Sequence, residues 1–202
     1  MNEPVNPQAD GHAMAGANAV ENTESELGAI DRAKGPVAAA EYLPLLQSQY
    51  GNESAGQKVI PAAFQFLNNS MGGWRTGLHL LAGEPGSGKS SFALLNAAVA
   101  AQAGFPVLYM SFDVQAEFLV LKMLCQQAGL NSRDMLDGTL NEGVLSAAIA
   151  AQEETFSRIE VIEADPELPN ESAVEMARQL IAESERDRAL VIIDYLQIWA
   201  AG

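Results

Sequence analysis

The sequence has few of the residues that stabilise secreted proteins or that bind nucleic acid through bulk charge. Cys125 is the single cysteine among 202 residues, so no intramolecular disulfide can form. Its place in the apolar run FLVLKMLCQQAGL predicts a buried thiol in a reduced compartment.

Lysine and arginine total 11 against 26 acidic residues, which gives a formal net charge of -15. This balance argues against a surface that grips nucleic acid through clustered basic side chains. Any contact with DNA must come from a local loop, from a ring of subunits or from further sequence.

Long apolar runs are also missing. The stretch FALLNAAVAA is interrupted by Asn96 and bounded by Gln102 well before the roughly 18 residues that a membrane span requires. The first thirty residues are acidic and lack the apolar central block of a signal peptide. These two absences predict a cytoplasmic protein without a membrane contact.

Composition divides the chain into three parts. Residues 1–35 are poor in large apolar side chains, and their first thirty positions hold five acidic residues and no lysine or arginine. We therefore expect a disordered acidic tail there, because such a segment buries too little surface to offset the entropy of ordering. Residues 36–57 predict a short helix, interrupted at Pro44, and a linker. The compact domain is expected over residues 58–202.

Within that domain, apolar strands alternate with amphipathic helices. Strands are predicted at 77–83, 106–112, 158–164 and 189–199, and helices at 90–104, 116–130, 139–157 and 172–185. Capping boxes are expected for the last two helices, at Thr139 with Glu142 and at Ser172 with Glu175. Strands separated by helices of this length indicate an α/β fold with a mostly parallel sheet that is covered on both faces.

The stretch AGEPGSGKSS carries the strongest chemical signal. Residues 83–90 match G-x-x-x-x-G-K-[ST], and they lie between a predicted strand and a predicted helix, as a phosphate-binding loop must. Glycines let successive N–H groups point at a β-phosphate, the lysine neutralises phosphate oxygens, and the serine after it is a hard ligand for Mg²⁺. The alternative is a glycine-rich turn that happens to contain a lysine. The predicted nucleotide-binding residues are Gly83, Glu84, Pro85, Gly86, Ser87, Gly88, Lys89, Ser90 and Ser91.

Two aspartates follow predicted strands and are candidates for the same site. Asp194 ends the apolar run Leu190-Val-Ile-Ile and is expected to hold Mg²⁺ together with Ser90, because parallel sheets bind ligands at the carboxyl ends of their strands. A cap or turn residue is the alternative. Asp113 follows the strand at 106–112 and could either orient the attacking water or cap the next helix.

These residues resemble a known family. The stretches GGWRTGLHLLAGEPGSGKSSFAL, VLYMSFDVQAEFLVLKML, GLNSRDMLDGTL and VIIDYLQIW are similar, in order and spacing, to the ATPase domain of the bacterial replicative DNA helicase of the DnaB type. DYLQ is the most specific piece. The resemblance covers roughly residues 58–202 and implies a P-loop NTPase with a RecA-like three-layer fold. It further implies ATP and Mg²⁺ as cofactors, a hexameric ring, and unwinding of DNA around one single strand.

Carried over residue by residue, the resemblance makes Lys89 and Ser90 the phosphate and magnesium residues and Asp194 the second acidic motif. Asp113 falls where the family has a catalytic glutamate, which favours the water-orienting role. Aspartate is shorter by one methylene, about 1.5 Å, and a misplacement near 1 Å can cost ~100-fold in rate. This substitution counts against full hydrolytic competence. Catalytic roles are thus assigned to Lys89, Asp113 and Asp194.

The resemblance covers only the amino-terminal half of the family's ATPase domain. The family's helical amino-terminal domain has no counterpart in the acidic tail, and its DNA-binding loops, sensor strand and arginine finger come after the DYLQ strand. We therefore expect ATP binding with negligible hydrolysis by the 202-residue chain, and an empty slot between the strands at 77–83 and 189–194. A RecA-like ATPase in recombination or plasmid replication is one alternative. A nucleotide-binding interaction protein that does not hydrolyse ATP is another.

Overall fold

The computed structural model describes residues 38–44, 59–165 and 167–195. The chain divides into two units, Met1–Lys58 and Val59–Gly202. In the first unit, the 3-10 helix η2 (Ala39–Tyr42) is followed by helical residues at 43 and 44. The predicted acidic tail and most of the predicted linker lie outside the described residues.

The sheet of the second unit is built from three parallel strands in the order β2-β1-β3. Tyr109 of the central strand lies opposite Val161 on one side and Ile192 on the other. Every residue of the central strand is buried, as expected for an apolar strand enclosed on both faces of a parallel sheet. The strands are β1 (Val107–Ser111), β2 (Ile159–Glu163) and β3 (Leu190–Asp194).

Six helices of this unit are described, and four of them were expected from the sequence. The short helices α3 and α6 were not expected, since neither contains a buried residue and neither is long enough to show a clear period. The helices are α3 (Gln65–Met71), α4 (Lys89–Gln102), α5 (Ala116–Ala128), α6 (Ser132–Leu136), α7 (Glu142–Phe156) and α8 (Asn170–Glu183).

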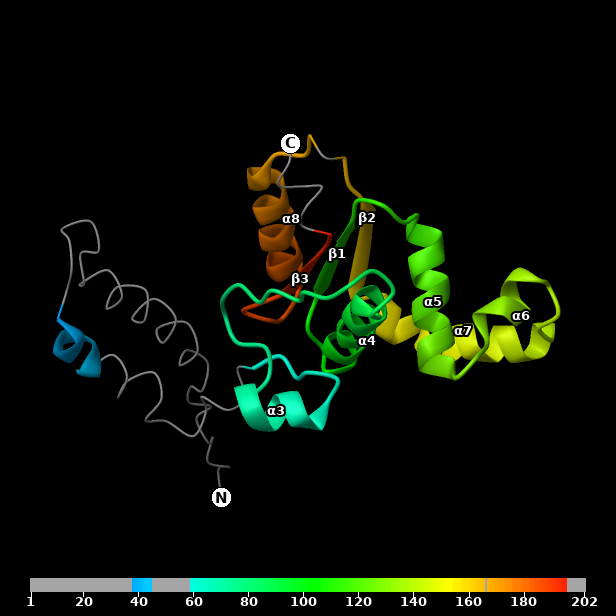
Figure 1. Ribbon diagram of the computed structural model, residues 1–202, viewed down its shortest axis with the longest axis horizontal. Helices are drawn as coiled ribbons and strands as arrows, with labels where there is room; N and C mark the ends of the chain where they lie inside the picture. The colour runs from blue at the N-terminus through cyan, green and yellow to red at the C-terminus, as the bar shows by residue number, and fades with distance from the viewer. Residues whose placement is uncertain (1–37, 45–58, 166, 196–202) are drawn as a thin grey trace, which may run out of the picture. The chain divides into compact units, whose positions relative to one another are not determined.

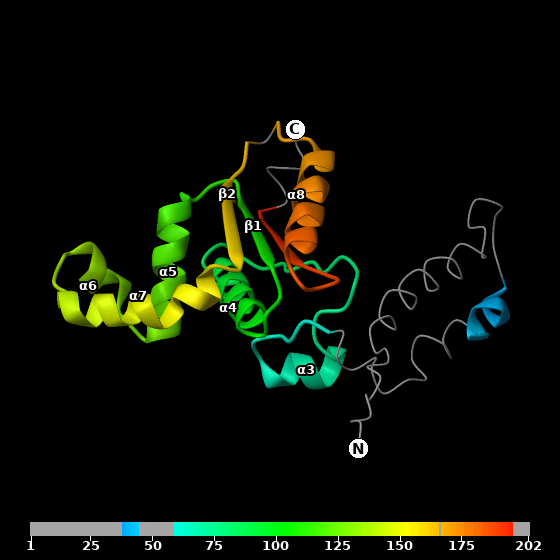
Figure 2. The ribbon, with the colours of Figure 1, turned by 180° about the vertical axis from the view of Figure 1, so that it is seen from behind.

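Helices cover both faces of the sheet. Val107 and Tyr109 pack with α4 and α5 in one hydrophobic core, whereas Leu108 and Met110 pack with α8 in a second core. Figure 1 shows α8 on one side of the strands and α5 on the other, and the view from behind in Figure 2 agrees. The predicted α/β class, three layers around a parallel sheet, is confirmed.

The prediction of a strand at residues 77–83 is wrong. The segment has no regular structure, and Leu78, Leu80 and Leu81 are exposed at 82%, 71% and 52%. A strand needs a neighbour to satisfy its backbone N–H and C=O groups, and no described residue provides one. No described backbone hydrogen bond joins residues 78–82 to 190–194 either, so these two segments have not closed up on each other.

The predicted capping boxes are also wrong. Helix α7 is capped by Asn141, whose Oδ1 accepts hydrogen bonds from the N–H groups of Gly143 and Val144, while Thr139 donates its hydroxyl to the carbonyl of Asp134. Helix α8 begins two residues before Ser172, after Pro169, without a side-chain cap. In both cases a residue outside the sequence pattern defines the start of the helix.

Asn96 fixes the segment before the phosphate loop against α4. Its side chain is 2% exposed, and its Oδ1 accepts hydrogen bonds from the Ala63 N–H at 2.9 Å and from the Trp74 indole at 3.0 Å. Its amide donates to the carbonyl of Phe92 at 2.8 Å. Phe92 also meets the Trp74 ring edge to face. Trp74 thus packs against α4 through its ring and its indole N–H. His79 is exposed, and its ring meets the Trp74 ring edge to face.

We expect Asn96→Leu to destabilise the protein by about 3 kcal/mol, because it leaves two donors without their acceptor and each lost bond costs about 1–3 kcal/mol. Urea unfolding followed by circular dichroism measures this loss. The matched control is Gln102→Leu on the same helix, where an exposed side chain makes an exposed bond, so a change within about 0.5 kcal/mol is expected. Equal losses in the two variants would contradict this role of Asn96.

Candidate nucleotide-binding site

The predicted phosphate loop connects the irregular segment at 77–83 to α4. Gly86 and Gly88 have φ values of 79° and 90°, a left-handed conformation that favours glycine. A Cβ built at either position meets no atom within 4 Å, so both glycines border open space. Gly88 is the N-cap of α4 and provides no side-chain hydrogen bond. The first N–H groups of the helix are therefore available to an anion.

Lys89 closes over this loop in the structure. Its ammonium donates hydrogen bonds to the carbonyls of Gly83 and Glu84, both at 3.0 Å. Ser90 and Ser91 follow in the first turn of α4, and Gln126 of α5 donates to the Ser91 carbonyl at 3.1 Å. The lysine is thus held by neutral acceptors, which anionic phosphate oxygens can replace because charge-assisted hydrogen bonds are stronger.

Asp194 ends β3 and is paired with a tyrosine. The hydroxyl of Tyr109 donates to Asp194 Oδ2 at 2.7 Å. Burial, then the hydrogen bond and the negative charge of Asp194, raise the pKa of Tyr109 far above its usual value of 10.0. The phenol is therefore a protonated donor to this carboxylate.

The loop and Asp194 belong to the same face of the sheet. Leu190 and Ile192 of β3 pack in the core that α4 forms with Tyr109. Alternate residues of a strand point to the same face, so Asp194 is on the α4 side, at the carboxyl end of β3. The fold therefore brings the start of α4 and Asp194 to one side of the sheet, although no hydrogen bond or ion pair joins them within the described residues.

Asp113 follows β1 and is exposed. It is not the cap of α5, because the N-cap is Gln115 and the Ala116 N–H donates to Glu163 Oε1 at 2.8 Å. No hydrogen bond to the Asp113 carboxylate is found within the described part of the chain. The capping alternative is thus wrong, and the carboxylate remains available to a water molecule.

The donor set suits a magnesium ion that is bound together with a nucleotide. Ser90 and Asp194 provide a hydroxyl and a carboxylate, which are the hard oxygen ligands of Mg²⁺. Among the described residues, no group of three or more His, Cys, Asp or Glu side chains is placed to hold a metal ion. Mg²⁺ usually keeps several waters and binds through one or two protein ligands plus phosphates. These residues fit that pattern.

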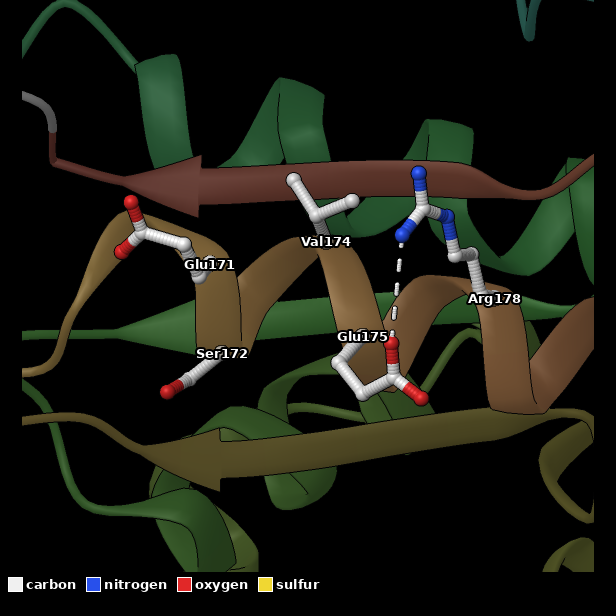
Figure 3. A pocket seen from close by; sticks show the side chains of 5 residues that line it. All are labelled: Glu171, Ser172, Val174, Glu175 and Arg178. Carbon is white, nitrogen blue, oxygen red and sulfur yellow. Dashed lines mark ion pairs between the residues drawn. The ribbon is translucent and has the colours of Figure 1, made fainter.

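A shallow hollow elsewhere on the surface is unrelated to this site. It lies along the exposed side of α8, and no phosphate-loop residue lines it. Figure 3 shows its side chains projecting from the helix, with Arg178 paired to Glu175 at 3.9 Å. The residues that line it are Glu171, Ser172, Val174, Glu175 and Arg178.

No helix in the described ranges is long and apolar enough to cross a membrane.

Sequence reasoning missed two residues of this region. Tyr109 is 85 positions from Asp194, and only the register of β1 against β3 brings them together. Glu163, at the end of β2, binds the first N–H of α5 in place of Asp113. A tyrosine inside a buried strand and a glutamate at a strand end carry no local signal of these roles.

Comparison with known proteins agrees with the predicted fold. A replicative DNA helicase DnaB from Nostoc sp. is 31% identical over 159 residues, covering 75% of this chain and 17% of that protein. One from Rhodothermus marinus is 32% identical over 165 residues, covering 80% and 17%. The replicative DNA helicase DnaC of Bacillus subtilis is 30% identical over 155 residues, covering 74% and 33%. The chain thus spans a third or less of the length of these relatives. The model of the DnaB-like helicase C terminal domain matches residues 59–202, so the chain belongs to that family.

Proposed function

We propose that residues 59–202 are the ATP-binding part of a replicative-type DNA helicase. The observation that carries this proposal is the phosphate loop, with Gly86 and Gly88 in left-handed conformations, directly before a helix on the same sheet face as Asp194. Family membership supplies the expected context. The proposed partners are single-stranded DNA and further copies of the chain in a hexameric ring, and the proposed compartment is the cytoplasm.

In the proposed mechanism, the backbone N–H groups from Gly86 to Ser90 hold the β-phosphate. Lys89 leaves the carbonyls of Gly83 and Glu84 and contacts the β- and γ-phosphates. Ser90 and Asp194 would hold Mg²⁺, which neutralises phosphate charge when bound. Asp113 accepts a hydrogen bond from the attacking water and orients it, or takes its proton. These residues bind and position the nucleotide.

A nucleotide-binding protein without appreciable hydrolysis is the second candidate. It is favoured by the short side chain of Asp113, which is exposed and makes no described hydrogen bond to hold it toward a nucleotide. The two candidates share the same binding site and differ only in turnover.

Titration of the full chain with a fluorescent ATP analogue tests the shared part of the proposal. Saturable binding that Mg²⁺ strengthens and unlabelled ATP displaces is the expected result. Turnover with single-stranded DNA present then separates the two candidates. An absence of saturable binding at millimolar analogue would contradict both.

A further inference from the structure

The hydrogen bond between Tyr109 and Asp194 joins two strands at the edge where the nucleotide site is proposed. Tyr109 is 0% exposed, and its ring packs in the core between α4 and the sheet. Its hydroxyl reaches the carboxylate at the end of β3, at 2.7 Å. The only described hydrogen bond of the Asp194 carboxylate is thus with a residue whose ring is buried in the core.

The sheet register brings these two residues together. Tyr109 lies opposite Ile192, and Ser111 lies opposite Asp194, so the tyrosine is two residues back from the carboxylate on the neighbouring strand. The Phe112 N–H donates to the Asp194 carbonyl at 2.9 Å, which fixes the backbone of the same residue. Both the backbone and one carboxylate oxygen of Asp194 are thus held by β1 and the residue after it.

A carboxylate has two oxygens, and Tyr109 occupies only Oδ2. Among the described residues, no side chain or backbone N–H donates to Oδ1. We propose that Tyr109 is a positioning residue, which holds Asp194 so that Oδ1 faces the magnesium of a bound nucleotide. This inference rests on the proposed function. Partners of metal ligands commonly set ligand orientation, and their loss typically costs 10- to 100-fold in metal affinity or activity.

The test is Tyr109→Phe, which removes only the hydroxyl. For each variant, the dissociation constant of a fluorescent ATP analogue is measured in EDTA and in Mg²⁺, and the ratio of the two is the magnesium effect. We expect Tyr109→Phe to reduce this effect about tenfold and to leave binding in EDTA unchanged. The electron paramagnetic resonance spectrum of Mn²⁺ with bound nucleotide should change as well, which a purely structural role would not require.

A matched control and a double mutant complete the design. Tyr195→Phe makes the same change at an exposed tyrosine next to Asp194, and we expect it to keep the wild-type magnesium effect. Asp194→Asn should remove the effect, and adding Tyr109→Phe to it should change nothing further, because the tyrosine acts through the carboxylate. Tyr109→Met, which refills the core without a hydroxyl, serves as a second variant if the phenylalanine variant folds poorly.

A wild-type magnesium effect in both Tyr109 variants would overturn the inference and leave Tyr109 as a core residue only. Binding of the wild-type protein without any magnesium effect would refute the assignment of Asp194, and the inference with it. Absence of nucleotide binding by the wild-type protein would refute the proposed function itself. Each failure is therefore recognised by a different measurement.

Discussion

Lys89→Ala is expected to weaken binding of Mg-ATP about 100-fold. Lys89 is the only basic residue among residues 82–91, and its ammonium already lies against the loop at Gly83 and Glu84. A hydrogen bond to a charged group contributes about 1.5–3 kcal/mol, and 1.4 kcal/mol corresponds to tenfold in affinity. Titration with a fluorescent ATP analogue measures the loss.

The matched control for this experiment is Lys122→Ala. Lys122 is on α5, where its ammonium lies over the Phe118 ring at 4.5 Å from the centroid. It has the same charge but no part in the phosphate loop, so the control should bind ATP as tightly as the wild-type protein. Equal affinity of Lys89→Ala and the wild-type protein would refute the assignment of the loop.

Asp113→Glu is expected to raise the rate of ATP hydrolysis by about 10- to 100-fold. The aspartate is exposed and does not cap α5, so a longer side chain can extend toward a bound nucleotide without loss of a described contact. A gain of one methylene corrects a misplacement of about 1 Å, which can be worth ~100-fold. Single-turnover hydrolysis of radiolabelled ATP, with single-stranded DNA present, measures the rate.

Two further variants decide whether position 113 takes part in the reaction. Asp113→Asn keeps the size of the side chain but removes its charge, and it should lower the remaining rate without changing affinity. Asp137→Glu lengthens an aspartate that pairs with Arg133 at 3.7 Å outside the site, and it should have no effect. A rate in Asp113→Asn equal to that of the wild-type protein would exclude a role for this carboxylate.

The parts of the fold that the sequence predicted are those formed by residues close together in the chain. The helices α4, α5, α7 and α8 and the three strands follow from apolar periodicity, which depends only on neighbouring residues. The segment at 77–83 has the same apolar composition, but it remains irregular because no described strand lies beside it. Strand formation depends on a partner far away in sequence, and periodicity does not reveal one.

In the candidate site, too, neighbouring residues were predictable from the sequence, whereas contacts between distant residues were not. The proposed phosphate loop is a continuous motif, so its residues could be assigned from the sequence, and the left-handed glycines follow from the turn that they make. The partner of Asp194 depended on which strand lies beside β3 and in what register, and neither can be derived from the residues near Tyr109. The capping of α5 by Glu163 likewise requires the order of the strands.

Hydrogen exchange with and without a slowly hydrolysed ATP analogue and Mg²⁺ tests the central claim most directly. The backbone amides of residues 86–91 should exchange more slowly when the analogue is bound, because they would donate to phosphate oxygens. Residues 171–178 along the hollow of α8 should exchange at the same rate in both samples. Unchanged exchange at residues 86–91 under saturating analogue, or slowing confined to residues 171–178, would contradict the account.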